Sequence, residues 1–186
     1  MKKTCLLFLY ISPIFFLSSC LDCERVSLSI DLVRKVGEVN YFNIVSNSKD
    51  EKTIKEDFRE LIKKVYFDEY STSDPDRITS KRLYRDNKQL NATVRFSFIY
   101  LDKVLKEFEI KKDKKGDYFI DVTKEVENYQ ISGNGRFVEV DSQKLFRWPK
   151  NGKEIKLEMK TKVFNELEKT RLLQYWQDWA DSHIRD

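Results

Sequence analysis

The residues that most often carry catalysis are scarce in this chain. Its single histidine, His183, lies close to the C-terminus, where chains are often frayed. A histidine-dependent hydrolase needs a nucleophile and an orienting acid held around that ring. We therefore expect no histidine-dependent triad.

Acidic residues are the other candidates for chemistry. Asp121 and Glu125 could act as a pair of glycosidase carboxylates. The chain holds 31 acidic residues, however, so such pairs arise often by chance. The loop around Asp74 lacks the EF-hand register and its central glycine, and Gly133-Asn134-Gly135 lacks the pattern of a phosphate loop. We expect no catalytic set, no metal site and no cofactor.

The first residues have the features of a secretory signal. Met1-Lys2-Lys3 is basic, and residues 5–17 are almost wholly apolar. This stretch is short for a helix that spans a bilayer, which needs about 20 residues, and Pro13 interrupts it. We therefore favour a cleaved signal over a signal anchor.

The end of this segment holds a cysteine in a specific setting. Leu17-Ser18-Ser19-Cys20 resembles the lipobox of bacterial lipoproteins: an aliphatic residue, two small residues and a cysteine. The resemblance covers only residues 1–20. It implies cleavage between Ser19 and Cys20, a diacylglyceryl group on the Cys20 sulfur and a stable membrane anchor. The alternative is an ordinary signal peptide with a chance cysteine.

The lipobox predicts the domain organisation. Residues 1–19 are expected to form the signal peptide, residues 20–25 the lipidated cysteine with a short tether, and residues 26–186 a single domain. In enterobacteria-like sorting, Asp directly after the cysteine retains a lipoprotein in the inner membrane. Leu21 stands there instead, so we expect the outer membrane more than the inner one.

Charge and cysteine content narrow the partners. Loss of Lys2 and Lys3 leaves 33 of the 35 basic residues beside 31 acidic ones, a formal charge of +2. This balance argues against a nucleic-acid partner, which usually requires a strongly basic surface. Only Cys23 remains beside the anchor, so the mature domain can form no internal disulfide and no zinc site.

The hydrophobic pattern predicts an α+β fold built on an antiparallel β meander. Val26, Leu28 and Ile30 alternate with polar residues, and 39–45 gives a second strand that we expect to pair with the first as a hairpin. Further strands are expected at 94–100, 104–110 and 118–122. Asn134-Gly135 and Asn151-Gly152 are expected to be hairpin turns. They would join strands near 126–132, 136–141, 144–148 and 154–160, which gives a sandwich or a partly closed barrel.

Two helices are expected to pack on this sheet. Between residues 50 and 67, Ile54, Phe58 and Leu61 fall on one face at helical spacing, opposite a face that mixes both charges. The tail, 161–183, returns to helical spacing. We expect the first helix to lie on the sheet and not on lipid.

Two clusters are candidates for an interaction surface. Trp176 and Trp179 lie one turn apart on the tail helix, where they either fill the core or form an exposed anchor. Four lysines gather at one predicted turn: Lys111, Lys112, Lys114 and Lys115. Such a cluster could bind an anionic surface, although Asp113 and Asp117 dilute its charge.

Function remains open between three classes. The first is a non-enzymatic binding module of the cell envelope, held on a membrane by its lipid and contacting an envelope protein or lipid. The second is a carrier or chaperone for a lipid or apolar ligand, and a large dry cavity would favour it. The third is a carboxylate-dependent envelope hydrolase, which a cleft with two facing acids would favour.

Overall fold

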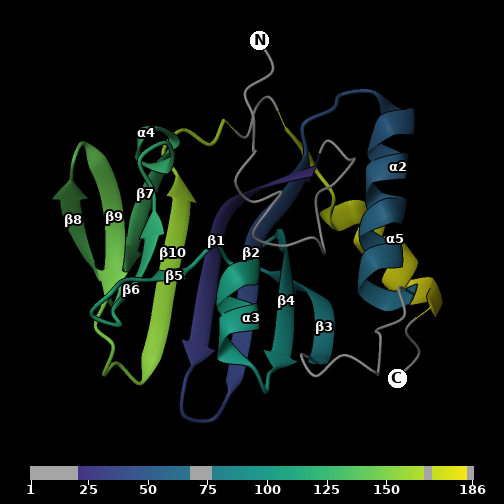
Figure 1. Ribbon diagram of the computed structural model, residues 1–186. Coiled ribbons are helices and arrows are strands. Elements are labelled where there is room, and N and C mark those ends of the chain that lie inside the picture. The colour runs from purple at the N-terminus through teal and green to yellow at the C-terminus, as the bar shows by residue number, and fades with distance from the viewer. Residues whose placement is uncertain (1–20, 68–76, 166–168, 184–186) are drawn as a thin grey trace.

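The computed structural model describes residues 21–67, 77–165 and 169–183. Within these residues the chain forms two antiparallel sheets accompanied by helices, so the predicted α+β fold is confirmed (Figure 1). The sheets do not close into a barrel. Ser19, Cys20 and the loop around Asp74 lie outside the described residues.

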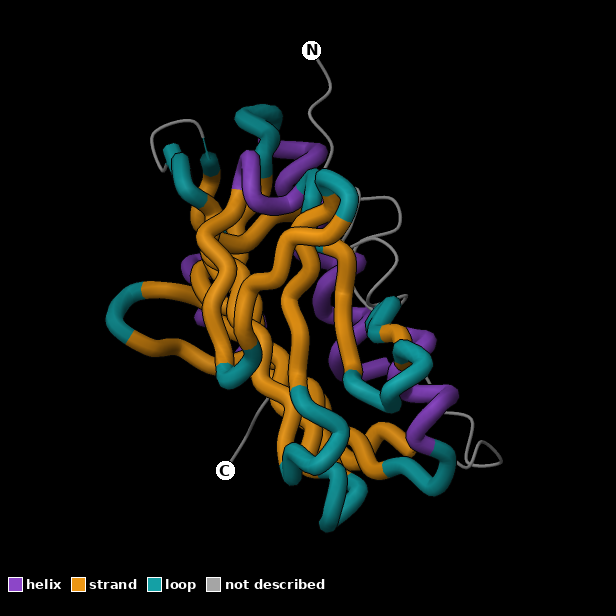
Figure 2. The backbone as a smooth tube through the Cα atoms, turned by 60° about the vertical axis from the view of Figure 1, so that its left-hand side comes forward, coloured by secondary structure: helices purple, strands orange, loops and turns teal. Residues whose placement is uncertain are grey.

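The larger sheet has seven strands in the order β3-β4-β2-β1-β10-β7, with β11 paired to β2. These strands are β1 (Leu21–Asp31), β2 (Val36–Ser46), β3 (Arg77–Asp86), β4 (Gln89–Ser97), β7 (Tyr129–Gly133), β10 (Glu154–Thr161) and β11 (Thr170–Arg171). Figure 2 shows this sheet from a second side.

The alternation at the start of the domain produces the predicted hairpin. Val26, Leu28 and Ile30 are buried, and Leu28 pairs with Val39 across the β1–β2 ladder. Residues 21–25, which the sequence predicts to be part of a tether, belong to β1, in which Leu21 pairs with Ser46 and is 4% exposed. Because β2 pairs with β1 as far as Leu21, the residues expected to form a linker are part of the β-sheet instead.

The first predicted helix is present. It consists of α2 (Glu51–Ile62) and a π-helical turn, η1 (Lys63–Phe67). Asp50 caps it, since its carboxylate accepts a hydrogen bond from the Thr53 backbone N–H at 2.9 Å. The buried hydroxyl of Ser46 donates to the buried Asp57 carboxylate at 2.6 Å, which ties α2 to β2.

The tail helix is shorter than predicted. α5 covers Leu173–His183 and not 161–183. β10 continues to Thr161, and the Lys162 backbone N–H then donates to the Asn128 carbonyl at 2.9 Å, so the chain is still extended where we expected a helix. β11 pairs with the end of β2 before α5 begins. α5 contacts α2 and β4, and Figure 1 shows α2 and α5 together at one side of the larger sheet.

A helix also replaces one predicted strand. The sequence predicts a β-strand at 104–110, but α3 (Leu101–Glu107) occupies most of this segment. Val104, Leu105 and Phe108 are buried at spacings of one and four residues, which is one face of a helix and not of a strand. Phe108 faces Val26, Leu28 and their neighbours across a void of about 20 Å³.

The second sheet has four strands in the order β5-β6-β9-β8. They are β5 (Lys111–Lys112), β6 (Tyr118–Asp121), β8 (Arg136–Val140) and β9 (Gln143–Trp148), and the short helix α4 (Glu125–Asn128) follows β6. β8 and β9 form a hairpin whose turn is Asp141-Ser142, both at positive φ.

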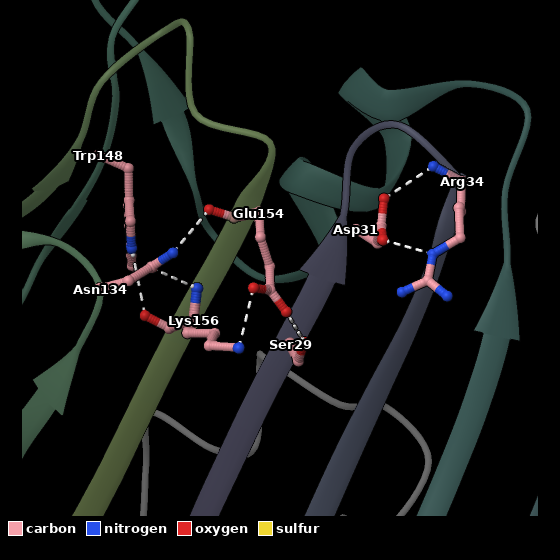
Figure 3. Close-up of polar contacts among 7 residues, drawn as sticks. All are labelled: Ser29, Asp31, Arg34, Asn134, Trp148, Glu154 and Lys156. Atoms are coloured by element: carbon pink, nitrogen blue, oxygen red, sulfur yellow. Dashed lines mark hydrogen bonds and ion pairs between the residues drawn. The ribbon is translucent and has the colours of Figure 1, made fainter.

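The two Asn-Gly pairs are not hairpin turns. β7 pairs with β10 and not with β8, so Asn134-Gly135 carries the chain from one sheet to the other. Asn151-Gly152 does the same between β9 and β10. The side chain of Asn134 acts as a backbone substitute at this crossing: it donates to the Glu154 carbonyl at 2.9 Å and accepts from the Lys156 N–H at 2.8 Å (Figure 3).

The junction between the sheets is completed by a tryptophan. Trp148 is 1% exposed, and its Nε1–H donates to the Lys156 carbonyl at 3.2 Å (Figure 3). Its ring meets that of Phe146 edge to face, with centroids 5.2 Å apart. Both sheets therefore share one core.

Candidate functional site

The structure places the predicted lysine cluster at the edge of the second sheet. Lys111 and Lys112 form β5, and Lys114 and Lys115 lie in the turn that follows; all four are exposed. Asp113 closes this turn. Its carboxylate accepts hydrogen bonds from the backbone N–H groups of Lys115 and Asp117 and forms an ion pair with Arg147. Asp113 and Arg147 thus hold the shape of this tip.

Two of these lysines also line an open cleft, the α3 cleft, between α3 and strands β5 and β6. Its volume is about 610 Å³. The residues that line it are Asp102, Leu105, Lys106, Glu109, Ile110, Lys111, Lys112, Ile120 and Asp121. Leu105, Ile110 and Ile120 are buried, so the cleft has apolar walls beneath a charged rim.

The rim of the α3 cleft carries both signs of charge. Three acids, Asp102, Glu109 and Asp121, stand among three lysines. Lys112 reaches the Asp102 carboxylate at 3.9 Å, which links β5 to α3. A site of this kind suits a ligand that presents both cations and anions, such as a polypeptide, better than a polyanion.

Asp121, the last residue of β6, accepts two hydrogen bonds from Thr123. The hydroxyl of Thr123 donates to its carboxylate at 2.6 Å, and the Thr123 backbone N–H donates at 3.0 Å. These hydrogen bonds, first that of the hydroxyl, and the nearby charge of Lys111 hold the pKa of Asp121 below its usual value.

Glu125 differs from Asp121. It is 6% exposed at the start of α4. Burial, followed by the negative charges of Asp121 and Glu109, raises the pKa of Glu125. Asp121 lines the α3 cleft and Glu125 does not, so the predicted acid pair does not face one common space.

Glu109 occupies a strained position on the cleft. It follows α3 with φ +54°, in the left-handed region that favours glycine. Its N–H donates to the Lys106 carbonyl at 3.1 Å, and the Ile110 N–H donates to the Leu105 carbonyl at 2.8 Å. These bonds end the helix in the way a glycine usually does, and the rim gains a carboxylate at that point.

A further cluster, which the sequence did not reveal, is the end patch, formed by Val33, Val36, Ile99 and Tyr100. These four side chains are 68%, 39%, 60% and 61% exposed. The Phe98 N–H donates to the Lys35 carbonyl at 3.0 Å and so brings the β1–β2 turn next to the segment that leads into α3. Ile99 and Tyr100 directly precede α3, the helix that lines one wall of the cleft.

The turn that carries half of this patch is rigidly built. The Asp31 carboxylate accepts hydrogen bonds from the backbone N–H groups of Val33 at 2.9 Å and Arg34 at 2.7 Å. It also accepts one from the Arg34 guanidinium (Figure 3). The backbone N–H of Arg34, and then its side chain, lower the pKa of Asp31. The turn is therefore fixed by its own side chains.

Trp176 and Trp179, for which the sequence leaves open a core or a surface position, lie elsewhere, on α5. Both are half-buried and pack against the core. The Trp179 ring stacks on Tyr66 at 4.8 Å and on His183 at 5.0 Å, while the neighbouring Tyr175 meets Phe58 at 6.0 Å. Contact with α2 thus takes up much of this aromatic face, and the structure does not join it to the lysines.

The remaining chemistry of the described residues is limited. Over 21–67, 77–165 and 169–183, no three His, Cys, Asp or Glu side chains are grouped closely enough to hold a metal ion. Cys23 is half-buried and packs against the core. Among the helices of that same part of the chain, none has the length and apolar content to cross a bilayer.

Comparisons with known proteins do not extend this picture. No family model matches the chain, and neither the curated proteins nor the solved structures gave a match.

Proposed function

We propose that this protein is a membrane-anchored bacterial lipoprotein, acylated on Cys20, that acts as a non-enzymatic binding module of the cell envelope. Its partner is a polypeptide that binds the end patch and the α3 cleft. The observation that carries this proposal is the placement of exposed apolar side chains on the β1–β2 turn and on the segment that leads into α3, the helix that lines a cleft with a charged rim.

The anchor is supported by the leader and by the start of the domain. A basic and apolar leader ends in Leu17-Ser18-Ser19-Cys20. β1 begins at the next residue, Leu21, and its 11 residues run to the turn that carries Val33. At about 3.3 Å per residue, this strand is about 35 Å long. An anchor at Cys20 and the end patch would therefore lie at opposite ends of β1.

A polypeptide partner is supported by the composition of the surface. Interfaces between proteins combine an apolar centre with a polar, charged rim. The end patch supplies apolar side chains, and the α3 cleft supplies a charged rim. Contiguous exposed apolar groups at one place mark interaction sites more often than scattered ones do. The near-balanced charge of the mature chain does not favour a nucleic acid.

The outer membrane is the proposed location, because Leu21 and not an aspartate follows Cys20. The membrane-proximal end of the domain would then carry Leu21 and the end of β2, with which it pairs.

The other two classes find less support. A carrier needs a large dry cavity, whereas the void between the larger sheet and Phe108, about 20 Å³, has room for roughly one water molecule, and the larger α3 cleft is open and has a charged rim. For a hydrolase, the two acids would have to flank a common space, whereas Asp121 lines the cleft and Glu125 is buried.

Site-specific photo-crosslinking in the native envelope tests the partner surface. A photoreactive phenylalanine analogue replaces Tyr100 in the full-length protein, and the matched control replaces Phe137, which is 51% exposed on β8 of the other sheet. We expect a discrete protein adduct from position 100 and none of that size from position 137.

A second substitution links the adduct to the end patch. Ile99→Asp places a charge on the patch at a side chain that is 60% exposed, so the fold should tolerate it. The adduct from position 100 should disappear in this variant. Equal adducts from positions 100 and 137, or an adduct that survives Ile99→Asp, would contradict the proposed binding surface.

A further inference from the structure

One apolar side chain stands out at the end of the domain where β1 begins. Val163 is 80% exposed, a larger fraction than any other large hydrophobic residue in the part of the chain that the structure describes. It lies in the segment 162–165, which follows β10. The exposed side chain of Lys162 precedes it, and a half-buried Phe164 follows.

The contacts of this segment place it beside the start of β1. The ammonium group of Lys169 lies 4.5 Å from the centre of the Phe164 ring. The same ammonium group forms an ion pair with the Asp22 carboxylate. Only one side chain therefore separates Phe164 from Asp22, and Figure 1 shows the chain that leaves β10 at the end of the sheet where β1 begins.

Leu21, the residue that follows Cys20, is already part of the larger sheet. Leu21 and Asp22 pair with Ser46 and Val45 of β2, and Leu21 is buried. One residue of extended chain spans at most about 3.6 Å. If Cys20 carries the lipid, as proposed above, Asp22 is two residues away, at most about 7 Å along the chain, and is therefore held close to the headgroups.

From this geometry we infer that the segment 162–165 is a second contact with the bilayer, with Val163 in the interfacial region among the lipid headgroups. This inference rests on the proposed anchor. The Lys162 ammonium donates to the Val126 carbonyl at 2.6 Å, and its other two N–H groups remain for anionic headgroups. The occupant of this surface is lipid and not a protein.

A second contact near Asp22 would also restrict the orientation of the domain. A single anchor at Cys20 would leave the sheet free to tilt. With Val163 in the headgroup region, β1 points away from the bilayer and the end patch is presented to the aqueous phase.

Spin-label accessibility in proteoliposomes tests the inference. The full-length lipoprotein, carrying Cys23→Ser, receives a nitroxide label at Val163→Cys or at the control position Val33→Cys, which is 68% exposed on the end patch. The vesicles contain phosphatidylcholine and phosphatidylglycerol. Collision rates are measured with oxygen, which concentrates in lipid, and with a nickel chelate, which stays in water.

The expected result is a reversal of the two rates. The label at position 163 should collide mainly with oxygen, and the label at position 33 mainly with the nickel chelate. If the protein floats with the vesicles but both labels favour nickel, the second contact is wrong while the anchor stands. If the protein does not float with the vesicles, the anchor itself fails, and the inference fails with it.

Discussion

Phe58 tests most sharply whether α2 is part of the folded core. It is 8% exposed on the face of α2 that also buries Ile54 and Leu61, and its ring lies 6.0 Å from that of Tyr175 on α5. Phe58→Ala removes a buried ring and leaves a cavity between the two helices and the sheet. Truncations of this kind cost about 3–5 kcal/mol.

Urea unfolding of the purified protein measures this cost. Circular dichroism reports the whole fold, and tryptophan fluorescence adds the buried Trp148. In thermal unfolding of the same protein, the melting temperature should fall by about 6–20 °C, at about 2–4 °C per kcal/mol for a chain of this size. Val33→Ala is the control, because that side chain is 68% exposed and should change stability by less than about 0.5 kcal/mol.

A loss below about 0.5 kcal/mol for Phe58→Ala would refute the reasoning. It would mean that the apolar face of α2 contributes nothing to the core and is available to a partner. A loss equal to that of Val33→Ala would carry the same meaning.

Three further predictions follow from single contacts. Because burial raises the pKa of Glu125, the folded state holds this proton more tightly, and stability falls as pH rises from the ordinary value of 4.5 through the raised pKa. In urea unfolding, the free energy of unfolding of Glu125→Gln should therefore be larger than that of the wild type at about pH 7 and equal to it at about pH 4. An equal difference between the two proteins at both pH values would contradict the expected direction of the pH dependence. Asn134→Ala removes two hydrogen bonds at the sheet junction and should cost about 1 kcal/mol, while Asn151→Ala, at the other Asn-Gly pair, should cost less than half of that. The acyl-free domain from Leu21 onwards should elute as a monomer in size-exclusion chromatography and ignore liposomes; association that Trp179→Ala abolishes would overturn the core packing of α5.

Local periodicity predicted the elements whose partners are close in sequence. Val26, Leu28 and Ile30 alternate with polar residues, and their partner strand follows within a few residues, so the hairpin needs no information from the rest of the chain. The face of α2 is equally local. Its Ile54 and Phe58 are one helical turn apart, and both are buried as expected.

Turn preference failed where tertiary contacts decided the path. Asn134-Gly135 fits a type I′ turn, but Asn134 uses its side chain to bind β10, and the next strand joins the other sheet. One tight hairpin turn that does form is Asp141-Ser142, in which both residues adopt positive φ without glycine. The local sequence favours Asn134-Gly135 over Asp141-Ser142 as a hairpin turn, and the structure shows the reverse.

The candidate site was found only in part for a related reason. Lys111 and Lys112 were recognised as a cluster, but their partners Asp102 and Glu109 belong to α3, which was expected to be a strand. The end patch was missed because Tyr100 continues the alternation of β4, and this pattern does not show that the strand stops at Ser97.

The central claim is that lipid on Cys20 holds this protein on a membrane, and metabolic labelling tests it most directly. Cells that express the full-length protein are fed a palmitate analogue, and the labelled protein is compared with Cys20→Ser and with Cys23→Ser. The account predicts label on the wild type and on Cys23→Ser, and none on Cys20→Ser. Equal labelling of wild type and Cys20→Ser would contradict it.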